Sequence, residues 1–174
     1  MPITLRPQDN FGSVLNANTY ALEQEFVDYH EERGRDLTQW GTEDFKAALV
    51  RAFDYENNSF RYGGQRVRVD QVSAFPRYDL TDIDDNDVYG ITYPVKQAQM
   101  EYAYEGLVNG DLNPTPTRDG SGARVIQRSE SVGPISESYT FASGAVWSLP
   151  QYPKADSILK SRGYVVSGGQ IIRA

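Results

Sequence analysis

The sequence has no cysteine, a single histidine and no long hydrophobic run. Without cysteine the chain has no disulfide framework, no cysteine-based metal site and no thiol nucleophile. A membrane-spanning helix needs roughly 18 or more predominantly apolar residues, and no segment reaches that length. The N-terminal stretch MPITLRPQDNFGS lacks both the basic and the apolar region of a signal peptide. We therefore expect no membrane partner.

Motifs for catalysis and cofactor binding are equally scarce. His30 stands alone on an acidic stretch, and no Gly-x-Ser-x-Gly turn accompanies it. The glycine pairs at 63–64 and 168–169 match neither nucleotide-binding fingerprint. The Asp-rich segment 82–87 fails as an EF-hand, because Asp87 and Tyr93 occupy the positions that need Gly and Glu. We expect no enzymatic activity, no cofactor and no dedicated metal site.

Charge is abundant but uneven. The net charge is −7, with 10 Lys and Arg against 20 Asp and Glu in residues 1–117, and 7 against 4 in residues 118–174. Such asymmetry suits assembly with an oppositely charged surface, whereas DNA-binding modules are usually basic overall. The 12 tyrosines also fit interfaces, although they serve the edge of a core equally well.

Hydrophobic spacing predicts helices over residues 20–33, 43–57, 94–108 and 153–161. Asn18 or Thr19 is the expected cap of the first helix, and Thr42 that of the second. Strand-like composition at 124–128 and 136–141, with Gly133-Pro134 between, predicts a β-hairpin or extended arm.

The expected fold is mainly α: a small bundle of three to four helices with an inserted β-hairpin or arm and extended termini. The expected parts are an N-terminal arm (1–18), a helical core (19–110), a linker and hairpin (111–150), and a short helix with a C-terminal docking tail (151–174). The predicted core consists of Phe26, Trp40, Phe45, Leu49, Phe53, Phe75, Val95, Ala98 and Tyr102.

One pattern over residues 19–110 is more specific. It comprises Trp40, Ala48, Leu49, Ala52, Tyr62-Gly63, Gln71, Phe75-Pro76-Arg77, Pro94, Ala98, Glu101 and Ala103. This order resembles the head-tail connector, or neck adaptor, proteins of tailed bacteriophages, some of which carry the label DnaT-like single-stranded-DNA-binding. Phe75 stands where many relatives have Trp.

The resemblance implies a structural virion protein, assembled in the bacterial host cytoplasm into a dodecameric ring. Its implied partners are the portal protein, the next neck or tail protein, and double-stranded DNA that passes through the channel without sequence-specific contacts. The alternative that the second label implies is a single-stranded-DNA-binding module.

The candidate site residues fit either function. Arg61, Arg66, Arg68 and Arg77 are the best nucleic-acid candidates, with Tyr62 and Phe75 as stacking rings. The same arginines could instead pair with Asp82, Asp84, Asp85 and Asp87 of a neighbouring subunit, which the acidic net charge favours. The apolar tail, with Tyr164, Val165, Val166, Ile171, Ile172 and Arg173, is expected to dock on the portal or a neighbour.

Overall fold

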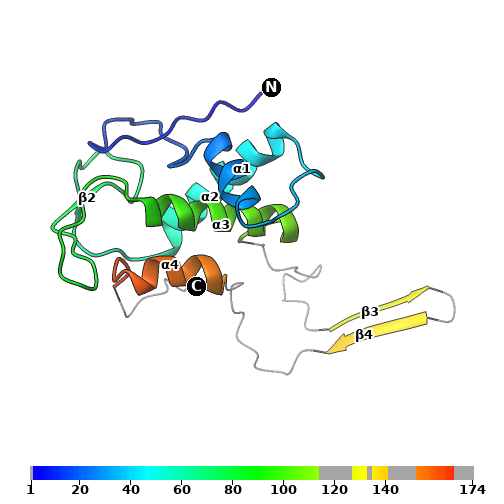
Figure 1. Cartoon of the computed structure of the whole chain (residues 1–174). Helices are drawn as coiled ribbons and strands as arrows, with labels where there is room; N and C mark the ends of the chain where they lie inside the picture. The colour runs from blue at the N-terminus through cyan, green and yellow to red at the C-terminus, as the bar shows by residue number, and fades with distance from the viewer. Residues whose placement is uncertain (1, 114–126, 133–134, 141–151, 167–174) are drawn as a thin grey trace. The chain divides into compact units, whose positions relative to one another are not determined.

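The computed structural model describes residues 2–113, 127–132, 135–140 and 152–166. Its helices are α1 (Glu23–Glu31), α2 (Thr42–Ser59), α3 (Tyr93–Asn109) and α4 (Pro153–Ser161). Two short strands, β1 (Gln65–Arg66) and β2 (Arg77–Tyr78), come after α2 and before α3 in the chain, and β2 is labelled in Figure 1. These helices and strands form one compact unit, and the hairpin of β3 and β4 belongs to a second. The prediction of a small, mainly α protein with a hairpin is confirmed.

The hairpin pairs β3 (Gln127–Val132) with β4 (Ile135–Thr140) in antiparallel register, with Gln127 opposite Thr140 and Val132 opposite Ile135. The sequence placed the first strand at 124–128, and residues 124–126 lie outside the described residues.

Helix α1 begins later than its spacing indicated. Its N-cap is Leu22, not Asn18 or Thr19, and the Leu22 amide donates to Glu25 Oε2 at 2.8 Å. The preceding amides of Tyr20 and Ala21 both donate to Gln99 Oε1 at 2.9 Å. Gln99 on α3 therefore satisfies two backbone amides of the extended segment that precedes α1.

Helix α2 also starts differently, with Gly41 as N-cap and Thr42 as its first residue. The Gly41 amide donates to Asp44 Oδ2 at 2.9 Å, so Asp44 takes the capping role predicted for Thr42. One side of α2 is buried, and it consists of Phe45, Ala48, Leu49, Ala52, Phe53 and Glu56.

Helix α3 packs against both α2 and α4 (Figure 1). Buried Ala98, Ala103 and Gly106 let backbones approach closely, and Gln99 Nε2 donates to the Leu49 carbonyl of α2 at 2.9 Å. Of the predicted core residues, Trp40 is half-buried, with its ring edge-to-face against Tyr104. The others are buried: Phe26, Phe45, Leu49, Phe53, Phe75, Val95, Ala98 and Tyr102.

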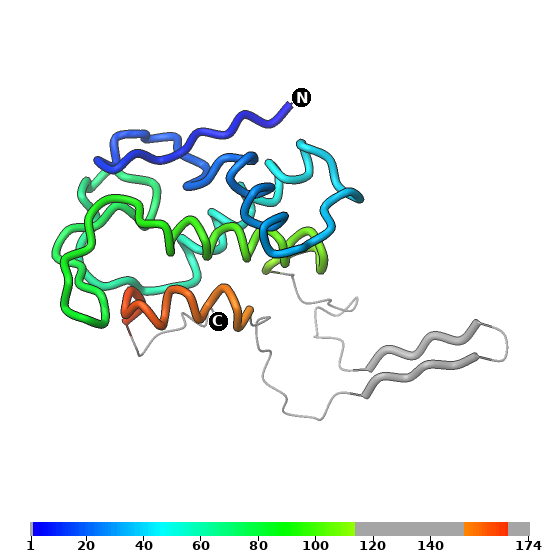
Figure 2. Tube along the Cα trace, viewed as in Figure 1, coloured from blue at the N-terminus to red at the C-terminus, as the bar shows by residue number. Residues whose placement is uncertain are grey.

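Figure 2 traces the long connection from α2 to α3, which loops out where α3 begins. This connection carries β1, β2 and all four candidate arginines.

Candidate nucleic-acid interface

Strands β1 and β2 form a two-stranded antiparallel ribbon, with Gln65 opposite Tyr78 and Arg66 opposite Arg77. The ribbon depends on Gly64, whose φ of 61° is in the left-handed region. A Cβ atom at Gly64 would lie 2.4 Å from the carbonyl oxygen of Tyr78. Only glycine permits this close approach of the two strands.

The loop between the strands is held in place by the buried residues Gln71 and Phe75. Gln71 is buried and its Nε2 donates to the carbonyls of Ser73 and Pro76, each at 3.0 Å. Phe75 precedes a cis peptide bond to Pro76 and is fully buried. Residues 71–76 therefore hold the loop in place, and residues 64–70 are all exposed.

Tyr62 and Phe75, the rings that the sequence predicted to stack on nucleobases, lie in the buried part of this connection. Phe75 packs edge-to-face against Tyr62, with ring centroids 4.9 Å apart. The Tyr62 hydroxyl donates to the Glu56 carbonyl at 3.0 Å, and only 6% of Tyr62 is exposed. Neither ring has a face open to a nucleotide, so the stacking role predicted for them is wrong.

Arg77 holds the ribbon together rather than facing solvent. Its guanidinium donates to the carbonyls of Gly63, Gly64 and Ala74, the last two at 2.9 Å. Burial, and then the nearby charge of Arg66, lower the pKa of Arg77 from its ordinary value. Because its guanidinium donates to these backbone carbonyls, Arg77 holds the two strands in position.

Three other arginines are exposed. Among the described residues, the Arg66 guanidinium donates only to the Gln71 carbonyl, at a long 3.3 Å. Arg68 pairs with Asp70 at 3.0 Å through two nitrogens. No ion pair within the described residues involves Arg61 or Arg66. Residues 61–78 contain four arginines and one aspartate, a net charge of +3 in a chain of −7.

The two strands and the loop between them form a groove of about 550 Å³, here called the β1–β2 groove. It is lined by Gly64, Gln65, Arg66, Val67, Arg68, Val69, Arg77 and Tyr78. Tyr78 is 45% exposed, and its hydroxyl donates to Gln65 Oε1 at 2.8 Å. The groove thus combines arginines with an exposed aromatic ring that sequence reasoning missed, although Tyr78 directly follows the Phe-Pro-Arg corner.

The acidic loop is closed on itself. The Asp82 carboxylate accepts hydrogen bonds from the amides of Asp84 and Asn86, both at 2.9 Å. Hydrogen bonds from Asn86 are the main reason that the pKa of Asp82 is lowered. Asp84, Asp85 and Asp87 are exposed. Within the described ranges, no group of three or more His, Cys, Asp or Glu is arranged to hold a metal ion.

The C-terminal docking residues lie partly on the chain's own core. Tyr164 is buried with its hydroxyl 3.2 Å from Thr92 Oγ1, and Val165 forms a β-bridge with Tyr62. Val166 is 43% exposed. Ile171, Ile172 and Arg173 lie outside the described residues.

His30 is buried with both ring nitrogens in use. Nε2 lies 3.1 Å from the Met100 carbonyl and Nδ1 lies 2.9 Å from Arg35 Nη1. Because the carbonyl accepts and the guanidinium donates, the imidazole is neutral with its proton on Nε2. This arrangement leaves no ring nitrogen for proton transfer to a substrate. In the described part of the chain, no helix has the length and apolar character to cross a membrane.

A family model described as "Putative DnaT-like ssDNA binding protein" matches residues 9–173, nearly the whole chain. The chain therefore belongs to this family of DnaT-like single-stranded-DNA-binding proteins. It matches no curated protein and no solved structure.

The family match corrects the main functional prediction. The interpretation as a phage neck adaptor is wrong, because the family's description names single-stranded DNA binding and no comparison indicates a connector. The predicted virion role, dodecameric ring, portal and tail partners, and channel for double-stranded DNA are withdrawn with it. No observation tests the pairing of Arg66 and Arg68 with a neighbour's acidic loop, which stays a prediction.

Proposed function

We propose that this protein binds single-stranded DNA in the β1–β2 groove. The observation that carries the proposal is the joint presence of Arg66, Arg68 and the exposed Tyr78 ring in one groove. Proteins that bind single strands combine a positive groove for the backbone with aromatic rings on which bases stack. The family's description supports the same ligand.

Each lining residue has a physical role in this proposal. Arg66 and Arg68 contact phosphates, and because solvent screens the exposed Arg68–Asp70 pair, a phosphate can replace Asp70 as the partner of Arg68. Tyr78 stacks on an unpaired base while Gln65 fixes its hydroxyl. The bases of a duplex are already stacked on each other, so the groove favours a single strand.

The acidic net charge does not oppose this binding. Salt limits the reach of exposed charges to about 10 Å at 0.1 M ionic strength, so the local charge of +3 governs a bound strand. At low salt, charges act over longer distances, so the negative charge of the whole chain should repel DNA. Binding at low salt should therefore be weaker than that of a basic protein. That the protein has no enzymatic activity stays a prediction.

Fluorescence anisotropy with a labelled oligothymidylate tests the proposal. Arg66→Ala and Arg68→Ala should each reduce the slope of log affinity against log salt by about 0.7, and the double variant by about 1.4. Arg51→Ala, which removes an exposed arginine on α2, is the matched control and should leave the slope unchanged. Wild-type binding with the same slope in the double variant would overturn the assignment of the groove.

A further inference from the structure

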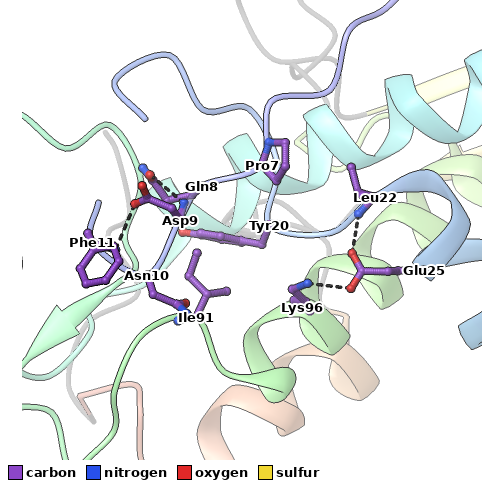
Figure 3. A pocket seen from close by; sticks show the side chains of 10 residues that line it. All are labelled: Pro7, Gln8, Asp9, Asn10, Phe11, Tyr20, Leu22, Glu25, Ile91 and Lys96. Atoms are coloured by element: carbon purple, nitrogen blue, oxygen red, sulfur yellow. Dashed lines mark hydrogen bonds and ion pairs between the residues drawn. The ribbon is translucent and has the colours of Figure 1, made fainter. Parts of the chain in front are cut away.

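A second pocket lies beside the N-terminal segment and differs in character from the β1–β2 groove. Its volume is about 450 Å³. Figure 3 shows the ten side chains that line it. The lining includes two carboxylates, Asp9 and Glu25, and one ammonium, Lys96, which donates to Glu25 at 2.6 Å. Phe11 and Ile91 supply apolar surface. The net negative charge of this lining would repel a phosphate, whereas it would not repel an uncharged planar ring.

Phe11 is the unusual residue of this pocket. It is 75% exposed, yet its backbone is held in a defined turn. The amides of Phe11 and Ser13 donate to Asp9 Oδ1 at 3.0 and 2.9 Å, and hydrogen bonds from Ser13 are the main reason that the pKa of Asp9 is lowered. Asn10 Oδ1 accepts the Ile91 amide at 2.9 Å, which fixes the loop to the start of α3. An exposed aromatic ring on an ordered turn forms a ready surface for stacking.

The turn touches the loop that forms the β1–β2 groove. Gly12 packs so closely on Gln71 that a Cβ atom would lie 2.2 Å from Gln71 Oε1. The Gln71 amide donates to the Arg68 carbonyl at 3.3 Å, and the Gln71 carbonyl accepts from Arg66. The Asp9 carboxylate also adds to the rise in the pKa of Arg68, after the larger effect of Asp70. Gly12, the neighbour of Phe11 in the chain, therefore contacts the residue whose backbone binds Arg66 and Arg68.

We propose that Phe11 and its pocket form a second base-binding site, which receives a nucleobase of the same single strand beyond the β1–β2 groove. This inference rests on the proposed function and extends it. Phosphates follow Arg66 and Arg68, Tyr78 stacks one base, and a base further along the strand stacks on Phe11. Asn10 Nδ2, which has no partner among the described residues, is placed to donate to a base carbonyl.

Oligothymidylates of two lengths separate this site from the groove. A strand of about 4 nucleotides fills the groove alone, and one of about 12 nucleotides reaches both sites. Phe11→Ala should weaken binding of the long strand by about 5- to 150-fold, the effect of one lost base stack, and leave the short strand unaffected. Phe11→Trp should retain the affinity for the long strand, whereas Phe11→Leu should behave as Phe11→Ala, because stacking needs a ring.

Leu15→Ala is the matched control, since Leu15 is a 51% exposed apolar residue of the same segment outside the pocket. A 5-iododeoxyuridine strand, cross-linked by ultraviolet light and analysed by mass spectrometry, should label Phe11 in addition to Tyr78. Wild-type binding with equal long-strand affinity in Phe11→Ala and no label on Phe11 would overturn this inference alone. Absence of any wild-type binding to either strand would overturn the proposed function and this inference together.

Discussion

The Arg35 guanidinium donates to Glu101 Oε2 at 2.8 Å and joins the segment after α1 to the middle of α3. Glu101 is 1% exposed and also accepts from Tyr29 Oη and Lys154 Nζ, both at 2.9 Å. One buried carboxylate therefore connects α1, α3 and α4. Burial alone would raise the pKa of Glu101, but hydrogen bonds from Lys154, Arg35 and Tyr29 lower it below its ordinary value.

Glu101→Gln should lower the free energy of unfolding at pH 7 by about 3 kcal/mol, because it removes the charge that compensates buried partners. Urea denaturation followed by circular dichroism measures this change. Glu32→Gln, which removes a 74% exposed carboxylate, is the control and should change stability by less than about 0.5 kcal/mol. Equal effects of the two substitutions would show that the Glu101 network contributes no more than a surface pair.

His30 should make the protein sensitive to mild acid. Burial, together with the charge of Arg35, lowers the pKa of His30 to about 4 despite the opposing Met100 carbonyl. The unfolded chain takes up this proton near pH 6.5, so stability should fall between about pH 6.5 and 4, by up to about 3 kcal/mol. Denaturation in urea at a series of pH values should show a flatter profile for His30→Gln. Parallel profiles between pH 6.5 and 4.5 would exclude His30 as the cause.

The sequence was sufficient where structure depends on neighbours in the chain. Helix α4 runs from Pro153 to Ser161, as its initial proline and the following Gly163 predict. The start of α1 was misplaced because Gln99, far along the sequence, binds the amides of Tyr20 and Ala21. No local pattern reveals such a partner.

The candidate site shows the same division. Residue types and spacing located the arginine segment, but which aromatic rings remain exposed depends on tertiary packing. Tyr62 and Phe75 are buried by contacts from other elements, and Tyr78 is left open. The net charge of −7, which favoured pairing of the arginines between subunits over contact with DNA, averages over the local +3 of residues 61–78.

Glu56 should have the opposite pH dependence to His30. It is fully buried on α2, and neither carboxylate oxygen has a hydrogen-bond partner in the part of the chain that the structure describes. Burial raises the pKa of Glu56 well above its ordinary value. Its contribution is therefore full below about pH 4.5, the unfolded pKa, and is lost as pH rises toward the folded pKa.

Glu56→Met should raise the free energy of unfolding at pH 8 by about 1–3 kcal/mol, because it removes a buried unpaired polar group at similar volume. Glu56→Gln should abolish the decline in stability as pH rises, because the Gln side chain does not ionise. Glu32→Gln, at a 74% exposed carboxylate, is again the control and should leave the pH profile close to that of wild type. A less stable Glu56→Met at pH 8 would contradict the account.

Tyr78 should contribute to DNA affinity through its ring. Tyr78→Leu should weaken oligothymidylate binding by about 5- to 150-fold, which corresponds to the 1–3 kcal/mol of one base–aromatic stack. Tyr78→Phe keeps the ring and loses only the hydrogen bond to Gln65, so its affinity should stay close to that of wild type. Fluorescence anisotropy at fixed salt measures both variants.

The matched control for Tyr78 is Tyr89→Leu, because Tyr89 is 78% exposed and does not line the β1–β2 groove. Equal losses in Tyr78→Leu and Tyr89→Leu would indicate a general surface effect instead of a stack in the groove. A large loss in Tyr78→Phe would transfer the contribution from the ring to the hydroxyl, which positions Gln65. The salt slope should be the same in Tyr78→Leu and wild type, since stacking releases no counterions, and this distinguishes Tyr78 from Arg66 and Arg68.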